Sequence, residues 1–284
     1  MNIKANAKIN IGLNVLSKRN DGYHNLESVF MPISLADDIS ITKLPTGFQT
    51  IVKTNISSLN NESNIIYKAI AILRQFVYFE DAFQILVTKN IPIGSGMGGG
   101  TSDAVAVMKA IIEMSHLSIS EDKLSRIYSL IGADAHFFRE NVPSLVTSIG
   151  DNVTPIKSKK SSYVLLVKPR ESLSTKTVFD NYDKENCRRS WNIHNVVEAL
   201  RVGDLSIIKE GICNSLQAPA YKLLPELEQI EAKLKETLPN AIISMTGSGS
   251  TLYALCKTEY KLKSLEKYFT KLGYFSTIAK TVKN

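Results

Sequence analysis

Hydrophobic and polar residues near the N-terminus alternate with a period of two. Apolar side chains occupy every second position over residues 3–15, with lysines and asparagines between them, which predicts a half-buried β-strand. Lys8 and Asn10 both fall on the polar face of this strand. Alternation resumes over about residues 26–35 and again around residues 39–41, so we expect two further strands there.

The period then changes to that of a helix. Apolar residues recur at helical spacing after Asn64, so this residue or Ser63 is expected to cap a helix that ends near Val77. A strand is predicted over residues 83–88, with helices over about 102–114 and 120–132. Asp134 is expected to precede a short helix, and strands around Leu145 and Val153 complete this half.

The second half shows a different order of elements. Strands are expected over residues 163–167, 242–245, 252–256 and 275–279, and helices over 196–200, 206–214, 226–235 and 260–272. Strand, helices, strand, strand, helix, strand is the order of a ferredoxin-like split βαβ domain. The basic, polar stretch 156–162 separates the halves, so we predict an α+β protein with domains over residues 1–156 and 157–284.

Composition excludes several classes of protein. The chain has 284 residues, of which 44% are hydrophobic and 21% charged, as expected for a globular protein rather than a disordered or coiled-coil chain. We find neither a run of about 20 apolar residues nor the apolar segment of a signal peptide. Three cysteines, Cys187, Cys213 and Cys256, suit neither a disulfide set nor a metal site, so we expect a cytoplasmic location.

The net charge of +7 favours an anionic partner such as a nucleotide, a phosphorylated metabolite or a nucleic acid. A lysine-rich solvated surface explains the same excess about equally well. The basic clusters around residues 157–160 and 257–263 are not interleaved with aromatic residues, as binding of single-stranded nucleic acid would require.

A glycine-rich segment is the strongest local signal. Five of the seven residues from Gly94 to Gly100 are glycine, between a predicted strand and a predicted helix. Glycine lets backbone N–H groups approach a ligand, and a helix N-terminus attracts phosphate. The alternative is a flexible loop. The segment is not a P-loop, because Thr101-Ser102 follow the glycines without a lysine, and no βαβ unit follows for a dinucleotide.

These residues resemble the ATP-binding motif of the GHMP kinases, which act on galactose, homoserine, mevalonate and phosphomevalonate. The resemblance covers nearly the whole chain, through residues 92–104, 7–13 with 19–24, 132–138 and 245–250 in order. Within the family it is greatest to kinases of 4-diphosphocytidyl-2-C-methyl-D-erythritol. One departure is Ala135-His136, which stands where a Val-Pro pair is common.

The resemblance implies a fold and an activity. The fold would be an N-terminal α/β ATP-binding domain of the ribosomal-protein type followed by the ferredoxin-like domain. The activity would be transfer of the ATP γ-phosphoryl group, with Mg²⁺, to the 2-hydroxyl of 4-diphosphocytidyl-2-C-methyl-D-erythritol in the non-mevalonate route to isopentenyl diphosphate. The partners would be ATP and this small molecule, with no nucleic acid and no membrane, in a monomer or weak homodimer.

The resemblance also implies residue roles. The ATP-binding residues would be Pro92, Ile93, Gly94, Ser95, Gly96, Met97, Gly98, Gly99, Gly100, Thr101 and Ser102. Asp134 would accept or orient the hydroxyl proton, and Lys8 would stabilise the transferred charge. Thr101 or Ser102 would lie near Mg²⁺. Helix capping is the alternative role for Asp134, Thr101 and Ser102, and we expect Gly98→Val to weaken ATP binding in a folded protein.

The substrate-binding residues would be Asn10, Tyr23, His24 and Phe179. Tyr23 would stack on the cytosine ring, His24 would bind its edge and Phe179 would offer a second stacking face; Asn10 would steady Lys8 or touch the substrate. Ordinary turn and core positions are the alternatives for these aromatic residues. His136 and His194 have no partners at metal-ligand spacing and are expected to be structural.

Three other functions compete with this interpretation. A GHMP kinase for homoserine or mevalonate is opposed by the segment Asp21-Gly22-Tyr23-His24 and by the triple glycine. A basic RNA-binding protein would share the N-terminal fold but would leave the glycine loop unexplained. An inactive relative is opposed by the presence of both Lys8 and Asp134.

Overall fold

The computed structural model describes residues 1–185, 190–208 and 212–283, so Cys187 lies outside the described residues. The chain forms two units that interleave along the sequence. The first comprises Met1–Ala7, Leu35–Ile91 and Gly98–Asn141, and the second comprises Lys8–Ser34, Pro92–Met97 and Val142–Asn284. Two long strands, β1 (Asn2–Lys18) and β2 (His24–Lys43), supply residues to both units. The domain boundary at residue 156 stays a prediction.

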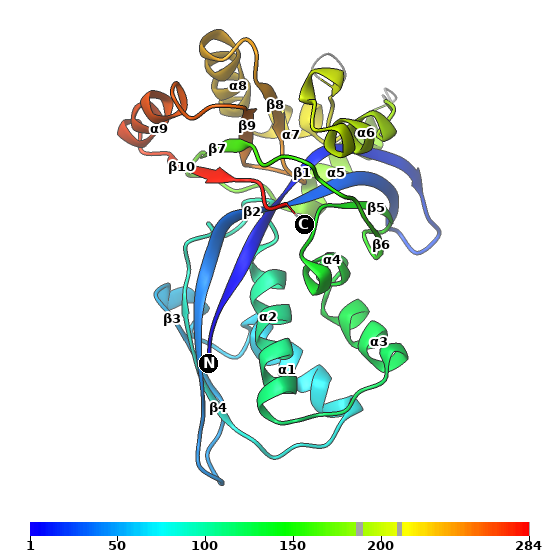
Figure 1. Cartoon of the computed structure of the whole chain (residues 1–284), viewed down its shortest axis with the longest axis vertical. Coiled ribbons are helices and arrows are strands. Elements are labelled where there is room, and N and C mark those ends of the chain that lie inside the picture. The colour runs from blue at the N-terminus through cyan, green and yellow to red at the C-terminus, as the bar shows by residue number, and fades with distance from the viewer. Residues whose placement is uncertain (186–189, 209–211, 284) are drawn as a thin grey trace. The chain divides into compact units, whose positions relative to one another are not determined.

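The first unit combines strands with helices. Its strand β3 (Ile51–Thr54) runs parallel to β4 (Phe83–Thr88), which pairs antiparallel with the C-terminal part of β2. The helices are α1 (Ile65–Phe76), α2 (Gly99–Met114), α3 (Glu121–Ile131), α4 (Ala135–Glu140) and the 3₁₀ turn η1 (Ser57–Leu59). Helices α1 and α2 lie side by side and pack against each other (Figure 1), and both contribute buried apolar residues to the unit.

The helix ends of this unit agree with the sequence except at one point. Asn64 caps α1, as predicted, because its side-chain oxygen accepts a hydrogen bond from the Ile66 N–H at 3.0 Å. Helix α3 lies between Ser120 and Gly132, also as predicted. Helix α2 begins at Gly99, earlier than expected, so its first turn is part of the glycine-rich segment.

The second unit contains a ferredoxin-like sheet, as the sequence predicted. Its strands are β7 (Tyr163–Lys168), β8 (Ile242–Met245), β9 (Leu252–Cys256) and β10 (Phe275–Lys280). They pair antiparallel in the order β10-β7-β9-β8, which is typical of the split βαβ arrangement. Helices α8 (Glu226–Thr237) and α9 (Leu262–Lys271) pack on this sheet (Figure 1).

Apolar side chains fill the space between this sheet and its helices. Leu165, Leu252 and Phe269 are fully or almost fully buried in that core. Elsewhere in the unit, the N-terminal part of β2 pairs with β5 (Ser144–Ser148), and β5 pairs with β6 (Asn152–Pro155). The remaining elements are α5 (Thr175–Lys184), α6 (His194–Val202), η2 (Leu205–Ile208) and α7 (Gln217–Leu223).

Several sequence-based predictions of secondary structure are wrong. The two strands expected over residues 26–35 and around 39–41 are one continuous strand, β2. Of the helix expected over residues 206–214, residues 206–208 lie in η2, residues 209–211 lie outside the described residues, and Asn214 forms a bridge with Leu13 of β1. Strand β3 and helices α5 and α7 were not predicted.

Strand β1 was expected to be half buried, and it is buried on both faces over its central part. Lys8, Asn10 and Asn14 on its polar face are 4%, 1% and 1% exposed. Burying a polar group is costly unless it finds hydrogen-bond partners, so this face must be matched by polar groups from elsewhere in the chain. Among the described residues, no helix is long and apolar enough to cross a membrane.

Candidate active site

Helix α2 starts beside the Asp134 carboxylate, within the first unit. Its N-cap is Gly98, which has a φ of 72°, in the left-handed region that favours glycine. A Cβ added to Gly98 would lie 2.7 Å from the Phe138 ring and 3.6 Å from Asp134 Oδ2. The N–H groups that a helix N-terminus offers to an anion therefore lie next to a carboxylate that can accept a proton.

Asp134 does not have the capping role that the sequence allowed. It directly precedes α4, but its side chain makes no capping hydrogen bond to that helix. The helix-capping interpretation is therefore wrong for the half-buried side chain, although Asp134 stands at the N-cap position of α4.

Thr101 and Ser102 are likewise not N-caps, because they lie inside the first turn of α2 after Gly98. The Ser102 hydroxyl is buried and donates a hydrogen bond to the Asn6 carbonyl at 2.7 Å. The Thr101 hydroxyl lies near Gly132, at 3.8 Å from the position of a Cβ added there. Of the two hydroxyls, that of Ser102 is therefore already engaged within the first unit.

The first part of the glycine-rich segment belongs to the second unit, where it packs on the C-terminal glycine motif. A Cβ on Gly96 would lie 2.4 Å from the Thr246 carbonyl oxygen and 2.9 Å from that of Gly249. Gly96 is therefore required by close backbone packing, whether or not a phosphate is bound. In the first unit, Gly98 is similarly confined by Phe138, so Gly98→Val should also lower stability, and whether the variant stays folded remains a prediction.

Asn10 is the centre of a buried polar cluster in the second unit. Its side-chain oxygen accepts hydrogen bonds from Lys8 Nζ at 2.7 Å and from the Gly247 N–H at 2.8 Å. Its side-chain nitrogen donates to Ser28 Oγ at 3.0 Å, and its backbone N–H donates to Thr246 Oγ1 at 3.1 Å. Asn10 therefore joins the N-terminal strand to the C-terminal glycine motif and holds the Lys8 ammonium in place.

The Lys8 ammonium is held by further contacts in the same unit. It lies 4.4 Å from the centre of the Phe30 ring, a cation–π contact. The Lys8 backbone N–H donates to the Met97 carbonyl at 3.0 Å, so β1 adjoins the glycine-rich segment at this point. A cation fixed among buried groups interacts with a developing negative charge more strongly than one in water. Lys8 and Asp134 belong to different units.

The residues expected to bind the nucleobase lie in the second unit. Tyr23 is 62% exposed, whereas His24 is 8% exposed and stacks on Phe179 with ring centres 4.9 Å apart. His24 Nε2 lies 2.7 Å from Asp183 Oδ1, and Lys18 Nζ lies 2.5 Å from Asp183 Oδ2. The structure therefore brings together His24 and Phe179 and leaves the Tyr23 ring accessible.

Sequence reasoning missed the supporting residues of these groups. Phe30, Ser28 and Thr246 act through contacts that join segments far apart in the chain. Asp183 could have been found by spacing, because it follows Phe179 by four residues and would share its face of a helix. Helix α5 itself was not predicted, so that signal was not visible.

A buried ionic cluster in the first unit connects residues 89–91, which follow β4, to Asp103 in α2. The Lys89 ammonium contacts both Asp37 and Asp103, and all three side chains are at most 5% exposed. Asp37 Oδ1 also accepts hydrogen bonds from the backbone N–H groups of Asn90 and Ile91, at 2.6 and 2.8 Å. Burial raises the pKa of Asp103 to about 7, against the opposing effect of Lys89.

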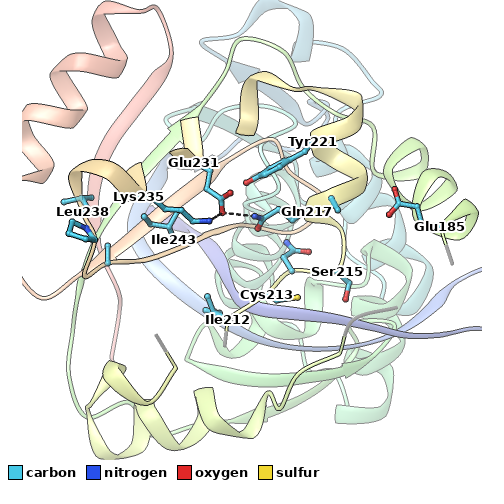
Figure 2. Close-up of a pocket in the computed structure, with 14 residues that line it drawn as sticks. Glu185, Ile212, Cys213, Ser215, Gln217, Tyr221, Glu231, Lys235, Leu238 and Ile243 are labelled. Atoms are coloured by element: carbon cyan, nitrogen blue, oxygen red, sulfur yellow. Dashed lines mark hydrogen bonds and ion pairs between the residues drawn. The ribbon is translucent and has the colours of Figure 1, made fainter. Parts of the chain in front are cut away.

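A cavity of about 790 Å³ in the second unit contains none of the predicted site residues (Figure 2). Three of its polar groups bind one another: Glu231 accepts a hydrogen bond from Gln217 at 2.9 Å and pairs with Lys235 at 3.1 Å. Among the described residues, no group of three His, Cys, Asp or Glu side chains could hold a metal ion. His136 binds Ser129, in agreement with a structural role.

Comparison with known proteins assigns the chain to a family. The model of the GHMP kinases N terminal domain matches residues 64–143, and that of the GHMP kinases C terminal domain matches residues 196–274. This protein belongs to the GHMP kinase family, and its mixed α+β fold is that of the family.

The most informative relatives share one activity. A 4-diphosphocytidyl-2-C-methyl-D-erythritol kinase of Clostridioides difficile strain 630 is 33% identical over 273 residues, covering 94% of this chain and 92% of its own. A kinase of the same name from Caldicellulosiruptor bescii is 31% identical over 269 residues, covering 94% of this chain and 93% of its own.

Solved structures agree with this assignment. The crystal structure of a 4-(cytidine 5'-diphospho)-2C-methyl-D-erythritol kinase superimposes with a TM-score of 0.84 at 25% identity, over the full length of both chains. A homoserine kinase from Cytophaga hutchinsonii gives a TM-score of 0.70 at 15% identity, over all of this chain and 95% of the other. The latter likeness concerns the fold alone.

Proposed function

We propose that this protein transfers the γ-phosphoryl group of ATP to the 2-hydroxyl of 4-diphosphocytidyl-2-C-methyl-D-erythritol. The observation that carries kinase chemistry is the Asp134 carboxylate beside the glycine N-cap of α2. The substrate follows from relatives of that name that cover more than 90% of this chain at 31–33% identity. The reaction belongs to the non-mevalonate route to isopentenyl diphosphate.

The nucleotide phosphates would bind at the N-terminus of α2, with residues 92–102 around them. The free N–H groups of the first helical turn, including those of Gly99 and Gly100, suit an anion. Mg²⁺ would neutralise charge on the phosphate oxygens. The Thr101 hydroxyl and the Asp134 carboxylate are hard oxygen donors of the kind that Mg²⁺ prefers, and Ser102 is already bound to Asn6.

Asp134 would orient the substrate hydroxyl and accept its proton as the new oxygen–phosphorus bond forms. The bond between the γ-phosphorus and the bridging oxygen breaks at the same time, and ADP leaves. Lys8, fixed by Asn10, would stabilise the negative charge on the transferred group and on the attacking oxygen. The Lys8 ammonium and the Asp134 carboxylate thus divide charge stabilisation and proton acceptance between them.

The cytosine end of the substrate would be bound by Tyr23, His24 and Phe179, with the exposed Tyr23 ring available to stack on the base. Asn10 would contribute to binding indirectly, through Lys8. We propose a monomer or weak homodimer that acts on these two small molecules, without nucleic acid. Neither Cys213 nor Cys256 is in a disulfide, which is consistent with a reducing compartment such as the cytoplasm.

The direct test is ATP consumption by the purified protein with each candidate alcohol. We expect ADP to form with 4-diphosphocytidyl-2-C-methyl-D-erythritol and not with cytidine diphosphate, which carries the base and phosphates without the acceptor. Homoserine and mevalonate are the competing substrates to include. Turnover of either one in preference to the cytidyl compound would replace this proposal by another kinase activity of the same family.

A further inference from the structure

We propose that Asp183 selects cytosine over uracil at the nucleobase end of the substrate by fixing the tautomer of His24. This inference rests on the proposed function. Asp183 does not itself contact the base. It acts as a positioning residue through the imidazole, and the observation that points to it is the contact of His24 Nε2 with Asp183 Oδ1 at 2.7 Å.

The Asp183 carboxylate joins three segments of the second unit. One oxygen binds His24 at the start of β2, and the other binds Lys18 at the end of β1, so both arms of the hairpin are tied to α5. The His24 side chain is 7% exposed, whereas those of Asp183 and Lys18 are 24% and 53% exposed. A buried imidazole is therefore held by a carboxylate whose second oxygen already has a cation.

The aromatic neighbours of His24 hold its ring in one orientation. Phe179 stacks on it with an angle of 25° between the rings, and Tyr182 meets its edge at 84°. Phe179, Tyr182 and Asp183 lie at positions i, i+3 and i+4 of α5, which places them on one face of the helix. One helical face thus supplies the stacking partner, the edge contact and the hydrogen-bond acceptor for the same ring.

The charge state of Asp183 decides what it can do to the imidazole. Burial raises the pKa of the Asp183 carboxyl, but hydrogen bonds from Lys18 and His24 outweigh burial and hold the pKa below its usual value. The ionised carboxylate can only accept hydrogen bonds. In neutral His24 the proton must then lie on Nε2, and Nδ1 is left as an acceptor.

Cytosine and uracil differ at the position that such an acceptor would read. Cytosine carries an N4 amino group, which donates, whereas uracil carries a carbonyl oxygen there, which accepts. An acceptor at His24 Nδ1 binds the cytosine amino group and opposes the uracil oxygen. Sites built to hydrogen-bond one polar group reject analogues that lack it, because a buried polar atom is then left unpaired. Lys18 contributes by binding the second oxygen of the same carboxylate, which holds Asp183 in place against His24.

The experiment compares Asp183→Asn with Asp180→Asn in the full-length protein. Asp180 is an exposed carboxylate on the same helix, so its variant controls for the loss of a charge from α5. KM and kcat are measured for ATP, for the cytidyl substrate and for its uridyl analogue. We expect Asp183→Asn to lower the cytidyl-to-uridyl ratio of kcat/KM roughly tenfold or more, mainly through KM for the cytidyl substrate, with KM for ATP unchanged. Asp180→Asn should retain the wild-type ratio.

A second readout reports the tautomer directly. Nitrogen-15 NMR of the four histidines, with His24 assigned by its loss in His24→Gln, should show a proton on Nε2 and none on Nδ1 in the wild type. Asparagine can donate as well as accept, so Asp183→Asn should no longer impose this tautomer. If Asp183→Asn does not fold, Lys18→Met replaces it. The Asp183 carboxylate then loses the contact that holds its second oxygen, so it is fixed less firmly against His24 and the ratio should fall as well.

The outcomes separate this inference from the proposed function. A wild-type protein that does not phosphorylate the cytidyl substrate would remove the proposed function and the inference together. A wild-type protein that does so, with the same cytidyl-to-uridyl ratio in Asp183→Asn, would overturn the inference alone. A proton on Nδ1 of neutral His24 in the wild type would overturn it as well.

Discussion

Lys89 Nζ lies 2.6 Å from Asp103 Oδ2, and this contact joins the segment after β4 to the first turns of α2. The same ammonium binds Asp37, which in turn holds the backbone N–H of Ile91. Ile91 leaves no room for a Cβ on Gly99, since that atom would lie 2.9 Å from the Ile91 side chain. A buried ionic contact thus fixes the start of the helix that is proposed to bind phosphate.

This cluster predicts a pH-dependent stability. Burial raises the pKa of Asp103 to about 7 in the folded protein, against roughly 3.9 in an unfolded chain. The folded state therefore binds more protons between about pH 4 and pH 7, and this contribution to stability is lost as pH rises through that interval. Asp103→Asn cannot titrate there. Urea denaturation from pH 4.5 to 7.5 should show the free energy of unfolding of Asp103→Asn increasing relative to that of the wild type as pH rises.

The exposed Asp122 of α3 provides the control for this experiment. Asp122→Asn should follow the pH dependence of the wild type throughout. A constant difference between Asp103→Asn and the wild type over the whole range would contradict a raised pKa at Asp103.

Asp134→Asn should lower kcat roughly 10²-fold or more, because the amide keeps the shape of the side chain but cannot accept the hydroxyl proton. The melting temperature should change little, because asparagine has nearly the same size and shape as aspartate. Steady-state kinetics with both substrates, alongside Glu140→Gln on the same helix, provide the measurement. A kcat within about twofold of the wild type would remove Asp134 from the chemical step.

Lys8→Ala should also lower kcat by roughly 10²-fold or more, because it removes a cation held among buried groups. Lys4→Ala is the matched control, since Lys4 is on the same strand and its side chain is 73% exposed. The role assigned to Lys8 requires the loss to appear in kcat. A rise in KM with kcat unchanged would instead make Lys8 a ground-state binding residue.

Two neighbouring glycines should differ in their tolerance of alanine. At Gly98 a Cβ would meet the Phe138 ring at 2.7 Å from a backbone with positive φ, so Gly98→Ala should lower the free energy of unfolding by on the order of 1–3 kcal/mol. At Gly100 the nearest atom is Ile65 Cγ2 at 3.6 Å, and Gly100→Ala should change stability by less than about 1 kcal/mol. Urea denaturation of both variants decides the matter, and equal losses would disprove the packing argument.

Tyr23→Ala should raise KM for the cytidyl substrate about tenfold and leave KM for ATP unchanged, because stacking on a base contributes about 1–3 kcal/mol. Tyr260→Ala, which removes a tyrosine that is 88% exposed, is the control. A change in KM for ATP alone would place Tyr23 at the ATP-binding site instead.

The sequence predicted the elements whose stability is local. Strands β4, β8 and β9 agree with the predicted ranges residue for residue, and Asn64 caps α1 through a neighbouring N–H group. Strand β2 was divided in two because Asp37 interrupts its apolar pattern. That carboxylate is compatible with a buried strand only through Lys89, which lies 52 residues further along the chain. Helix α5 was missed because only Val178 and Tyr182 of its ten residues are buried.

In the candidate site, too, local features could be predicted from the sequence and contacts with distant residues could not. Glycines and polar strand residues could be recognised from the sequence, but the reasons for them could not. Gly96 was attributed to phosphate, whereas the carbonyl oxygen of Thr246, 150 residues away, already excludes a side chain there. Lys8 and Asn10 were placed on a polar strand face, and their burial depends on groups that no local pattern reveals.

The bond from the Gly247 N–H to the Asn10 side chain spans 237 residues, which has a consequence for biosynthesis. Closing a loop of that length is slow and comes after local structure has formed. During translation the N-terminal strand emerges first, yet the group that fixes the Asn10 amide and, through it, the Lys8 ammonium is synthesised 237 residues later. A nascent or truncated chain that stops before Thr246 therefore carries Lys8 without this support, and phosphoryl transfer should begin only in chains that extend beyond Gly247.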